Sequence, residues 1–190
     1  MTSYLLSGPT GEPVSLDEAR AFLRVDGTDE DGLIATLITA ARLHVEGVTG
    51  RALLTQAWRV VLDRLPECGV VALPVAPCAS LTAITAYDAA GEPTSLDLDA
   101  IQLSADPAQV LLPAGYGMPI ALRQRQGIEL DYVAGFGDDP ADVPAALRQT
   151  LLLLVGYWFE NRDSVVIAGS GSIIPAGFDL MVAPYRAVRL

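Results

Sequence analysis

The sequence predicts an α+β fold in which a helical core carries a small inserted antiparallel β-unit and an extended C-terminal tail. The core is a helical hairpin plus a long apolar third helix. Apolar residues follow the helical period of about 3.6 residues up to residue 50 and again after residue 144, and they alternate in between. Residues 166–190 follow neither pattern. We expect the hairpin within residues 1–54, a β-rich subdomain over 55–138, the central helix over 139–163 and the tail over 164–190.

Two helices are expected in the first fifty residues. Ser15 and Glu18 have the S-x-x-E spacing of a capping box, in which each side chain accepts a backbone amide of the first turn. The first helix should therefore begin directly after Ser15, and it should stop near Asp26. A second helix follows from Thr28 to Gly50, with carboxylates at its start, where the helix dipole favours negative charge. Its apolar positions form one stripe: Ile34, Leu37, Ile38, Ala41, Val45 and Val48.

The region after Gln56 is predicted to be β-structure. Glycines and prolines recur there at short intervals and separate short runs of strand-forming residues. The expected strands are Trp58–Leu62, Leu81–Tyr87, Ile101–Ser104, Gln109–Leu112 and Ile128–Val133, with a turn at 89–92. The polar alternation is too loose to give the register or the strand order.

A third helix is expected to begin at Pro144. A proline at the first helical position lacks an amide that would be unpaired there anyway. The run from Leu151 to Phe159 is apolar nearly all round, which predicts a central helix packed on every side. The helical pattern fades at Asn161.

Composition and charge limit the classes of function. Hydrophobic residues make up 51% of the chain and charged residues 18%, which favours apolar contact with other protein. The formal net charge of −11 repels nucleic-acid phosphates and acidic lipids. Residues 1–15 lack the features of a signal peptide, and the longest apolar run, Leu151–Val155, is far too short to span a membrane. We therefore expect a cytoplasmic protein that does not bind DNA specifically.

No catalytic, metal-binding or cofactor-binding site is predicted. His44, the one histidine, lies mid-helix without a recognisable nucleophile or carboxylate partner. The acidic residues at 26–31 lack the glycine and the final glutamate of a calcium loop, and the glycine clusters do not continue into a phosphate-binding motif. One alternative is a small-ligand-binding or thiol-dependent enzyme domain that uses Cys68 or Cys78 of the β-unit. Another is a binding module whose exposed strand edge pairs with a partner.

Three segments of the chain carry a family resemblance. The front reads SLDEARAFLRVDGTDEDGLIATLITAARLHVEGVTGRALLTQAW, the last helix reads VPAALRQTLLLLVGYWFENRDSV, and the chain ends in LMVAPYRAVRL. In this order and spacing they resemble the head-tail connector (adaptor) proteins of long-tailed bacteriophages, including the adaptors of gene transfer agents. The resemblance spans nearly the whole chain, and none of the segments is a catalytic motif.

The resemblance implies a structural subunit rather than an enzyme. Such proteins form a ring, dodecameric like the portal, that lies beneath the portal of a filled head and joins it to stopper and tail components. They assemble in the bacterial cytoplasm and end in the neck of a phage or of a gene transfer agent particle. DNA passes through the ring without specific binding, which suits an acidic chain. The resemblance implies no cofactor and no membrane.

The C-terminal tail is the expected docking segment. The resemblance favours a tail hinged at Gly169 and Gly171 that carries its anchors into the portal or into a neighbouring subunit. Aromatic and arginine side chains are typical anchors of protein contacts. The expected contact residues are Ile173, Ile174, Phe178, Leu180, Met181, Tyr185 and Arg186. The alternative is a tail that folds back and buries its apolar residues on its own subunit.

Overall fold

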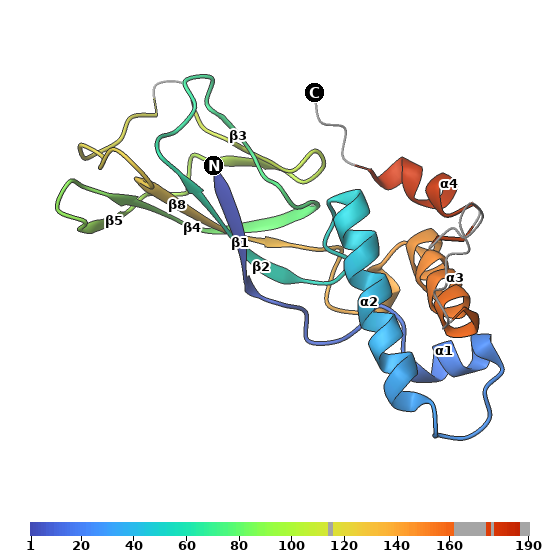
Figure 1. Cartoon of the computed structure of the whole chain (residues 1–190). Coiled ribbons are helices and arrows are strands. Elements are labelled where there is room, and N and C mark those ends of the chain that lie inside the picture. The colour runs from blue at the N-terminus through green and yellow to red at the C-terminus, as the bar shows by residue number, and fades with distance from the viewer. Residues whose placement is uncertain (114–115, 162–173, 176, 187–190) are drawn as a thin grey trace, which may run out of the picture. The chain divides into compact units, whose positions relative to one another are not determined.

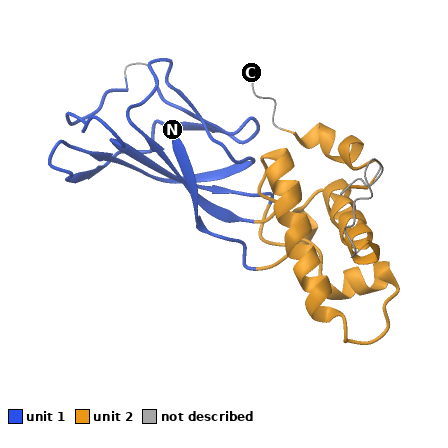
Figure 2. Ribbon diagram, viewed as in Figure 1, with its two compact units in different colours: residues 1–10, 55–136 blue, residues 11–54, 137–190 orange. Residues whose placement is uncertain are grey.

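Each of the two structural units of this chain is built from two separate stretches of sequence (Figure 2). The β-unit consists of residues 1–10 and 55–136, and the helical unit consists of residues 11–54 and 137–190. The computed structural model in Figure 1 describes residues 1–113, 116–161, 174–175 and 177–186.

The β-unit contains two antiparallel sheets (Figure 1). The larger sheet has the strand order β1-β2-β8-β4-β5, and the smaller sheet has the order β3-β7-β6. The strands of the larger sheet are β1 (Thr2–Ser7), β2 (Gln56–Leu62), β4 (Cys78–Tyr87), β5 (Pro93–Ser95) and β8 (Ile128–Ala134). Those of the smaller sheet are β3 (Val70–Ala72), β6 (Gln102–Ser104) and β7 (Gln109–Leu111).

Strand β8 lies at the centre of the larger sheet. Its burial alternates residue by residue, and Ile128, Leu130, Tyr132 and Ala134 are fully buried. This is the pattern of a strand with one face on a core. The Tyr132 hydroxyl accepts a hydrogen bond from the backbone amide of Val75 at 3.2 Å, and burial raises the pKa of Tyr132. The phenol therefore stays neutral and satisfied within the core.

The other face of β8 carries charged pairs with β2. Arg59 lies directly across from Asp131, and its Nε and Nη2 donate to the two carboxylate oxygens at 2.5 and 2.7 Å. Nη1 of Arg59 also lies 2.7 Å from Glu129. The hydrogen bonds to Asp131 raise the pKa of Arg59. A bidentate cross-strand pair of this kind fixes the register of the two strands.

The helical unit contains α1 (Leu16–Leu23), α2 (Asp31–Thr49), α3 (Ala145–Glu160) and α4 (Phe178–Val182), with 3-10 turns at Pro140–Asp142 and Ala183–Tyr185. The predicted capping box is present. The Ser15 hydroxyl accepts from the Glu18 amide at 3.1 Å, and the Glu18 carboxylate accepts from the Ser15 amide at 2.9 Å. Helix α2 ends at Gly50, whose φ of +68° favours glycine. The fully buried core residues include Ala19, Ile34, Ala41, Val45, Leu147, Leu151 and Leu154.

The predicted architecture of a helical core with a small inserted β-unit is wrong. The described residues form four α-helices and eight strands in two antiparallel sheets. The larger sheet includes β1, from a region where the sequence predicts no element. Tyr4, Leu5 and Leu6 of β1 are all about equally exposed, at 44%, 46% and 45%, so no alternating pattern marks the strand. The β-unit is therefore a full structural unit that starts at the beginning of the chain.

The predictions of a long apolar third helix and of an extended tail are also wrong. Helix α3 has 16 residues, fewer than the 19 of α2, and its fully buried residues lie on one face. Leu152 and Leu153 are only half-buried. An apolar run therefore did not mark a helix packed on every side, since apolar residues commonly occupy half-exposed positions as well as cores. The tail contains α4 and a 3-10 turn within its described residues. Within the described part of the chain, no helix has the length and apolar character needed to cross a membrane.

We expect Leu154→Ala to destabilise the helical unit strongly. Leu154 is 0% exposed, and truncating a buried leucine costs about 2–5 kcal/mol through lost burial and the cavity left behind. Leu43→Ala is the matched control, because Leu43 lies on α2 but is 57% exposed. Denaturant unfolding followed by circular dichroism measures both variants. Equal unfolding free energies for the two variants would contradict the assignment of the core.

We expect the capping box to make stability depend on pH. The hydrogen bond from the Ser15 backbone, helped by the charge of Arg148, lowers the pKa of Glu18 from its ordinary value of 4.5. A pKa that is lower in the folded state stabilises the fold above pH 4.5 and loses that contribution as the pH falls through the lowered value. The unfolding free energies of the unchanged chain and Glu18→Gln should therefore differ most near neutral pH and converge in acid. A difference that stays constant with pH contradicts this.

Candidate docking segment

The C-terminal segment contains the short helix α4. Gly177 precedes it with a φ of +90°, a left-handed conformation that favours glycine. Helix α4 spans only five residues and runs into the 3-10 turn Ala183–Tyr185, which contains Pro184. A helix this short is not stable by itself in water, so its position depends on what it packs against.

Phe178 and Val182 hold α4 against the rest of the helical unit. They are 2% and 0% exposed and lie one turn apart on the same face of the helix. The ring of Phe178 lies 5.3 Å from that of His44 on α2, and His44 meets Trp158 of α3 edge to face at 5.9 Å. The Nε2 atom of His44 is buried and has no hydrogen-bond partner. His44 therefore packs as an aromatic residue between three helices.

Polar contacts hold the end of the described segment. Arg51 directly follows Gly50, the C-terminal cap of α2, and is only 7% exposed. Its Nε donates a hydrogen bond to the backbone oxygen of Tyr185 at 2.5 Å. Arg186 forms an ion pair with Asp179 within the segment itself. The bond from Arg51 ties the 3-10 turn to the end of α2.

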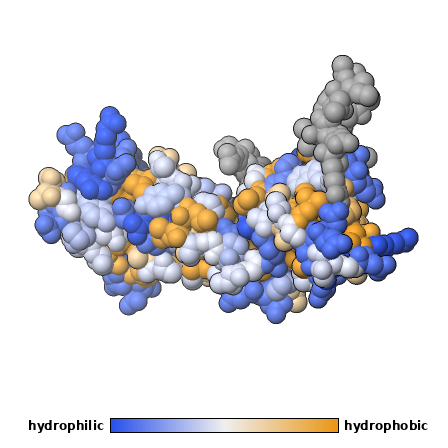
Figure 3. Space-filling view, turned by 60° about the horizontal axis from the view of Figure 1, so that its bottom comes forward, coloured by the Kyte–Doolittle hydropathy of each residue, from blue (hydrophilic) through white to orange (hydrophobic). Residues whose placement is uncertain are grey.

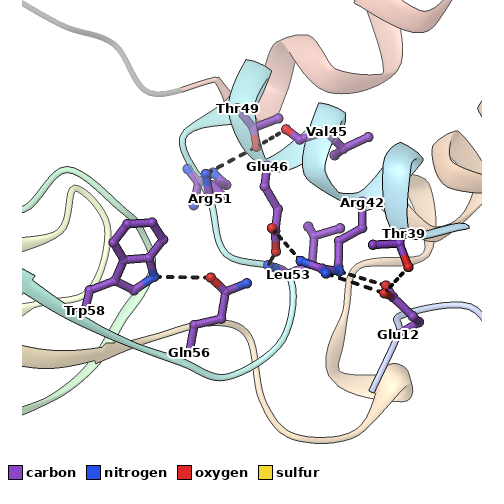
Figure 4. Close-up of polar contacts among 10 residues, drawn as sticks. All are labelled: Glu12, Thr39, Arg42, Val45, Glu46, Thr49, Arg51, Leu53, Gln56 and Trp58. Carbon is purple, nitrogen blue, oxygen red and sulfur yellow. Dashed lines mark hydrogen bonds and ion pairs between the residues drawn. The ribbon is translucent and has the colours of Figure 1, made fainter. Parts of the chain in front are cut away.

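The end of α2 is in turn held by a partly buried polar cluster (Figure 4). Arg42 donates to Glu12 through Nε at 2.7 Å and to Glu46 through Nη1 at 3.0 Å. The other oxygen of Glu46 accepts the backbone amide of Leu53 at 2.9 Å. The hydroxyl of Thr39 donates to Glu12 at 2.8 Å. The chain segments before α1 and after α2 are thus both fastened to α2.

The structure places the predicted docking residues in different environments. Phe178 is buried, whereas Leu180 is 81% exposed and Arg186 is exposed. Three others are half-buried, namely Ile174, Met181 and Tyr185. The remaining three, Ile173 and the hinge residues Gly169 and Gly171, lie outside the described residues. The sequence did not indicate the anchoring roles of His44 and Arg51, because both act on residues more than a hundred positions away.

Apolar side chains are also exposed elsewhere. They include Leu43 on α2, Phe22 on α1, and Tyr4, Leu5 and Leu6 on β1. On the face shown in Figure 3, hydrophobic residues form several patches separated by hydrophilic ones. No single apolar surface on this face marks one partner.

The thiols do not form an evident catalytic site. Cys78 is 3% exposed, and burial raises its pKa, which disfavours the reactive thiolate. Cys68 is exposed and lies with Arg64 in an open cleft of about 570 Å³. Its sulfur lies 3.8 Å from the backbone oxygen of Val70. Among the residues that the structure describes, no group of three His, Cys, Asp or Glu side chains is placed to hold a metal ion.

Comparison with known proteins supplies the class of protein to which this two-unit fold corresponds. Residues 13–91 match the family described as phage gp6-like head-tail connector protein. No curated protein sequence matches the chain. The relationship to head-tail connector proteins that the sequence predicts is thereby supported over the front of the chain, including α1, α2 and β2.

Solved structures extend the similarity to the whole chain and narrow the class. A chain from the neck of an empty gene transfer agent (GTA) particle, computed with C6 symmetry, is 26% identical with a TM-score of 0.82. Chains from the virion of a native GTA particle and from a native GTA neck computed with C12 symmetry are 27% and 25% identical, each with a TM-score of 0.79. Each comparison covers 100% of this chain and 97% of the other. The predicted resemblance to head-tail connectors and to GTA adaptors is confirmed.

We expect Phe178→Ala to release α4 while leaving the rest of the helical unit folded. The substitution removes the ring that packs on His44, and a five-residue helix has little stability of its own. Hydrogen exchange should then become faster in residues 178–186 and stay slow in α2 and α3. The matched control is Leu180→Ala on the exposed side of the same helix. Unchanged exchange in Phe178→Ala would show that the ring does not anchor α4.

Proposed function

We propose that this protein is a structural head-tail connector subunit that forms a ring beneath the portal of a tailed phage or GTA particle. The ring completes the head and joins it to stopper and tail components. The observation that carries the proposal is the full-length similarity to chains from GTA necks, together with the family match over residues 13–91. The subunit does no catalysis, and it needs no cofactor.

The proposed ring is dodecameric. One of the similar chains comes from a neck computed with C12 symmetry, which relates twelve equivalent positions around the axis. A closed ring requires a heterologous contact, in which two different surfaces of one subunit meet those of its two neighbours. The high apolar content of the chain suits a subunit that is covered on more than one side.

The C-terminal segment supplies the proposed contact with the portal or a neighbouring subunit. Phe178 and Val182 fix α4 to its own helical unit, so the opposite side of α4 can present Leu180 outward. Arg186 lies exposed beyond it. Arginine is enriched at the centre of protein contacts, and covering an exposed apolar side chain such as that of Leu180 is favourable.

The acidic character of the chain suits a channel for DNA. A net charge of −11 opposes tight binding of a polyanion, so DNA can move through the ring without being held. The proposed place of the protein is the neck of the particle, after assembly in the bacterial cytoplasm. Its partners are the portal ring, the stopper or tail proteins, and further copies of itself.

Leu180→Asp should block attachment of the protein to portal-bearing heads without unfolding it. Leu180 is 81% exposed, so a carboxylate there costs little in the free subunit but would be left unpaired in an apolar contact. Binding is measured by co-sedimentation with tail-less heads, and folding by thermal unfolding. Leu43→Asp on α2 is the matched control for an exposed leucine.

Two results would count against the proposal at different levels. Normal attachment of Leu180→Asp would remove α4 from the contact and leave the connector role standing. Failure of the unchanged protein to bind portal-bearing heads at any concentration would contradict the connector role itself.

A further inference from the structure

The arginines of this chain are nearly all paired, which makes the exceptions informative. Among the described arginines, all except Arg24, Arg64 and Arg125 form a hydrogen bond or an ion pair within the chain. The chain has 23 acidic residues and only 12 basic ones, so partners are abundant. An arginine that remains free in such an acidic chain is available to a partner outside it.

Two of the free arginines lie at the same end of the β-unit. Strands β2 and β8 pair as far as Leu62 and Ile128. The chain after Leu62 therefore lies beside the chain that leads into Ile128. The Asp63 carboxylate accepts the backbone amide of Gln126 at 2.7 Å. Arg64 directly follows Asp63 and Arg125 directly precedes Gln126, so the two arginines lie on either side of this hydrogen bond. Both are exposed.

A third arginine, Arg123, lines a hollow together with Arg64 and is held in a fixed position. Arg123 donates to the backbone oxygen of Gln126 through Nε at 2.8 Å and through Nη2 at 2.5 Å. Its guanidinium also lies 4.4 Å from the centre of the Tyr87 ring, a cation–π contact. We name Arg64, Arg123 and Arg125 the arginine cluster.

Arg64 of the arginine cluster lines an open cleft that contains both polar and apolar side chains. The cleft of about 570 Å³ is lined by Arg64 together with Leu65, Leu112 and Leu122. A second hollow of about 450 Å³ shares Arg64 and Leu122 and adds Arg123. Two carboxylates lie there as well: Asp63 accepts the Gln126 amide, and Glu67 lines the larger cleft. Tyr116 and Met118 also line the larger cleft, and aromatic residues, methionine and arginine are enriched in protein contacts.

The helical unit carries a surface of the opposite charge. Asp26 and Asp29 lie in the connection between α1 and α2, are exposed, and have no partner among the described residues. Asp31, at the end of this connection, is by contrast paired with Arg20. Arg24, the third free arginine, begins this connection, which also contains Glu30, so the loop carries one positive and three negative side chains and stays net acidic. The connection thus offers two free carboxylates on a short, exposed loop.

We propose that the arginine cluster and its cleft bind the acidic α1–α2 connection of a second copy of this chain. The inference rests on the proposed ring, because a heterologous ring contact joins two different surfaces of the same protein. Neighbouring copies that each carry a charge of −11 repel one another, so a favourable contact needs a local match of opposite charges. The arginine cluster and the free carboxylates supply that match.

A nucleic acid is the competing occupant, and the surrounding charge disfavours it. The β-unit contains nine acidic residues and four arginines. One of the four, Arg59, is already paired with Asp131 and Glu129. A unit that carries more acidic than basic residues repels a phosphate backbone more strongly than it repels a single acidic loop.

The first test is a charge exchange between the two surfaces. The variant Arg64→Glu/Arg125→Glu should weaken self-association at least about tenfold, and so should Asp26→Arg/Asp29→Arg. The variant that combines all four substitutions should associate again, because every reversed charge then meets a reversed partner. Sedimentation and electron microscopy of rings, alone and on portal-bearing heads, measure association. Ala89→Glu/Ala90→Glu, at an exposed turn of the β-unit, controls for added negative charge.

The second test uses the unchanged chain, so it does not depend on the folding of any variant. Cys68 lines the cleft and is exposed, whereas Cys78, the other cysteine, is 3% exposed. A thiol-alkylating reagent therefore reports mainly on the cleft. Ring formation should slow alkylation of Cys68, and moderate salt should restore it as it screens the contact.

Several outcomes would overturn the inference. They are unimpaired association of both charge-reversed variants, no recovery in the combined variant, and alkylation of Cys68 that is unaffected in the ring. Loss of DNA binding in Arg64→Glu/Arg125→Glu with unchanged self-association would assign the arginine cluster to nucleic acid instead. If the unchanged chain forms no ring and binds no heads, the proposed function fails and the inference fails with it; unaffected variants in a normal ring overturn the inference alone.

Discussion

The helical unit depends on one partly buried charged cluster, formed by Arg42, Glu12 and Glu46. Burial by itself would lower the pKa of Arg42, but the hydrogen bond to Glu12 and the charge of Glu46 outweigh it and leave the pKa raised. The side chains of Arg42, Glu12 and Glu46 are 10%, 28% and 13% exposed, so removing either carboxylate would leave a largely buried guanidinium without one of its partners. Because Glu46 also binds the amide of Leu53, the cluster fixes the chain on both sides of the α1–α2 hairpin. Those are the places where the chain passes from one unit to the other.

Local signals in the sequence predicted the helices better than the strands. The capping box of Ser15 and Glu18 and the glycine stop at Gly50 each act within one turn, so a single sequence reveals them. Helix α2 begins at Asp31 rather than Thr28, and its N-cap residue Glu30 makes no side-chain capping hydrogen bond that would mark the start in the sequence. Strand β1 exists only through pairing with β2, which puts Thr2 beside Val61. Such a distant pairing leaves no period in the sequence. The sequence therefore predicts too small a β-unit.

In the candidate docking segment, too, local signals were readable from the sequence and distant contacts were not. Its composition identified the apolar and arginine residues as candidates, but not which of them face inward. Phe178 and Leu180 are two positions apart and have opposite exposures, a difference that appears only once α4 is known to be a helix packed on His44. The bond from Arg51 to Tyr185 spans 134 positions and has no local signature. Which face of a helix is buried, and which distant polar groups bind each other, are tertiary properties that a local sequence motif does not reveal.

The interleaved course of the chain also has a consequence for its biosynthesis. Residues 1–10 leave the ribosome well before residue 136, where the sheet that they complete ends, and the α1–α2 hairpin must wait for α3, which ends at Glu160. Neither unit can therefore fold as an independent N-terminal domain during translation, the usual order for multidomain chains. At about 5–20 residues per second, an apolar hairpin and an unpaired first strand stay uncovered for several seconds or longer. Apolar surface and unpaired strand edges that are exposed in this way are prone to aggregate, and they are what chaperones cover during synthesis.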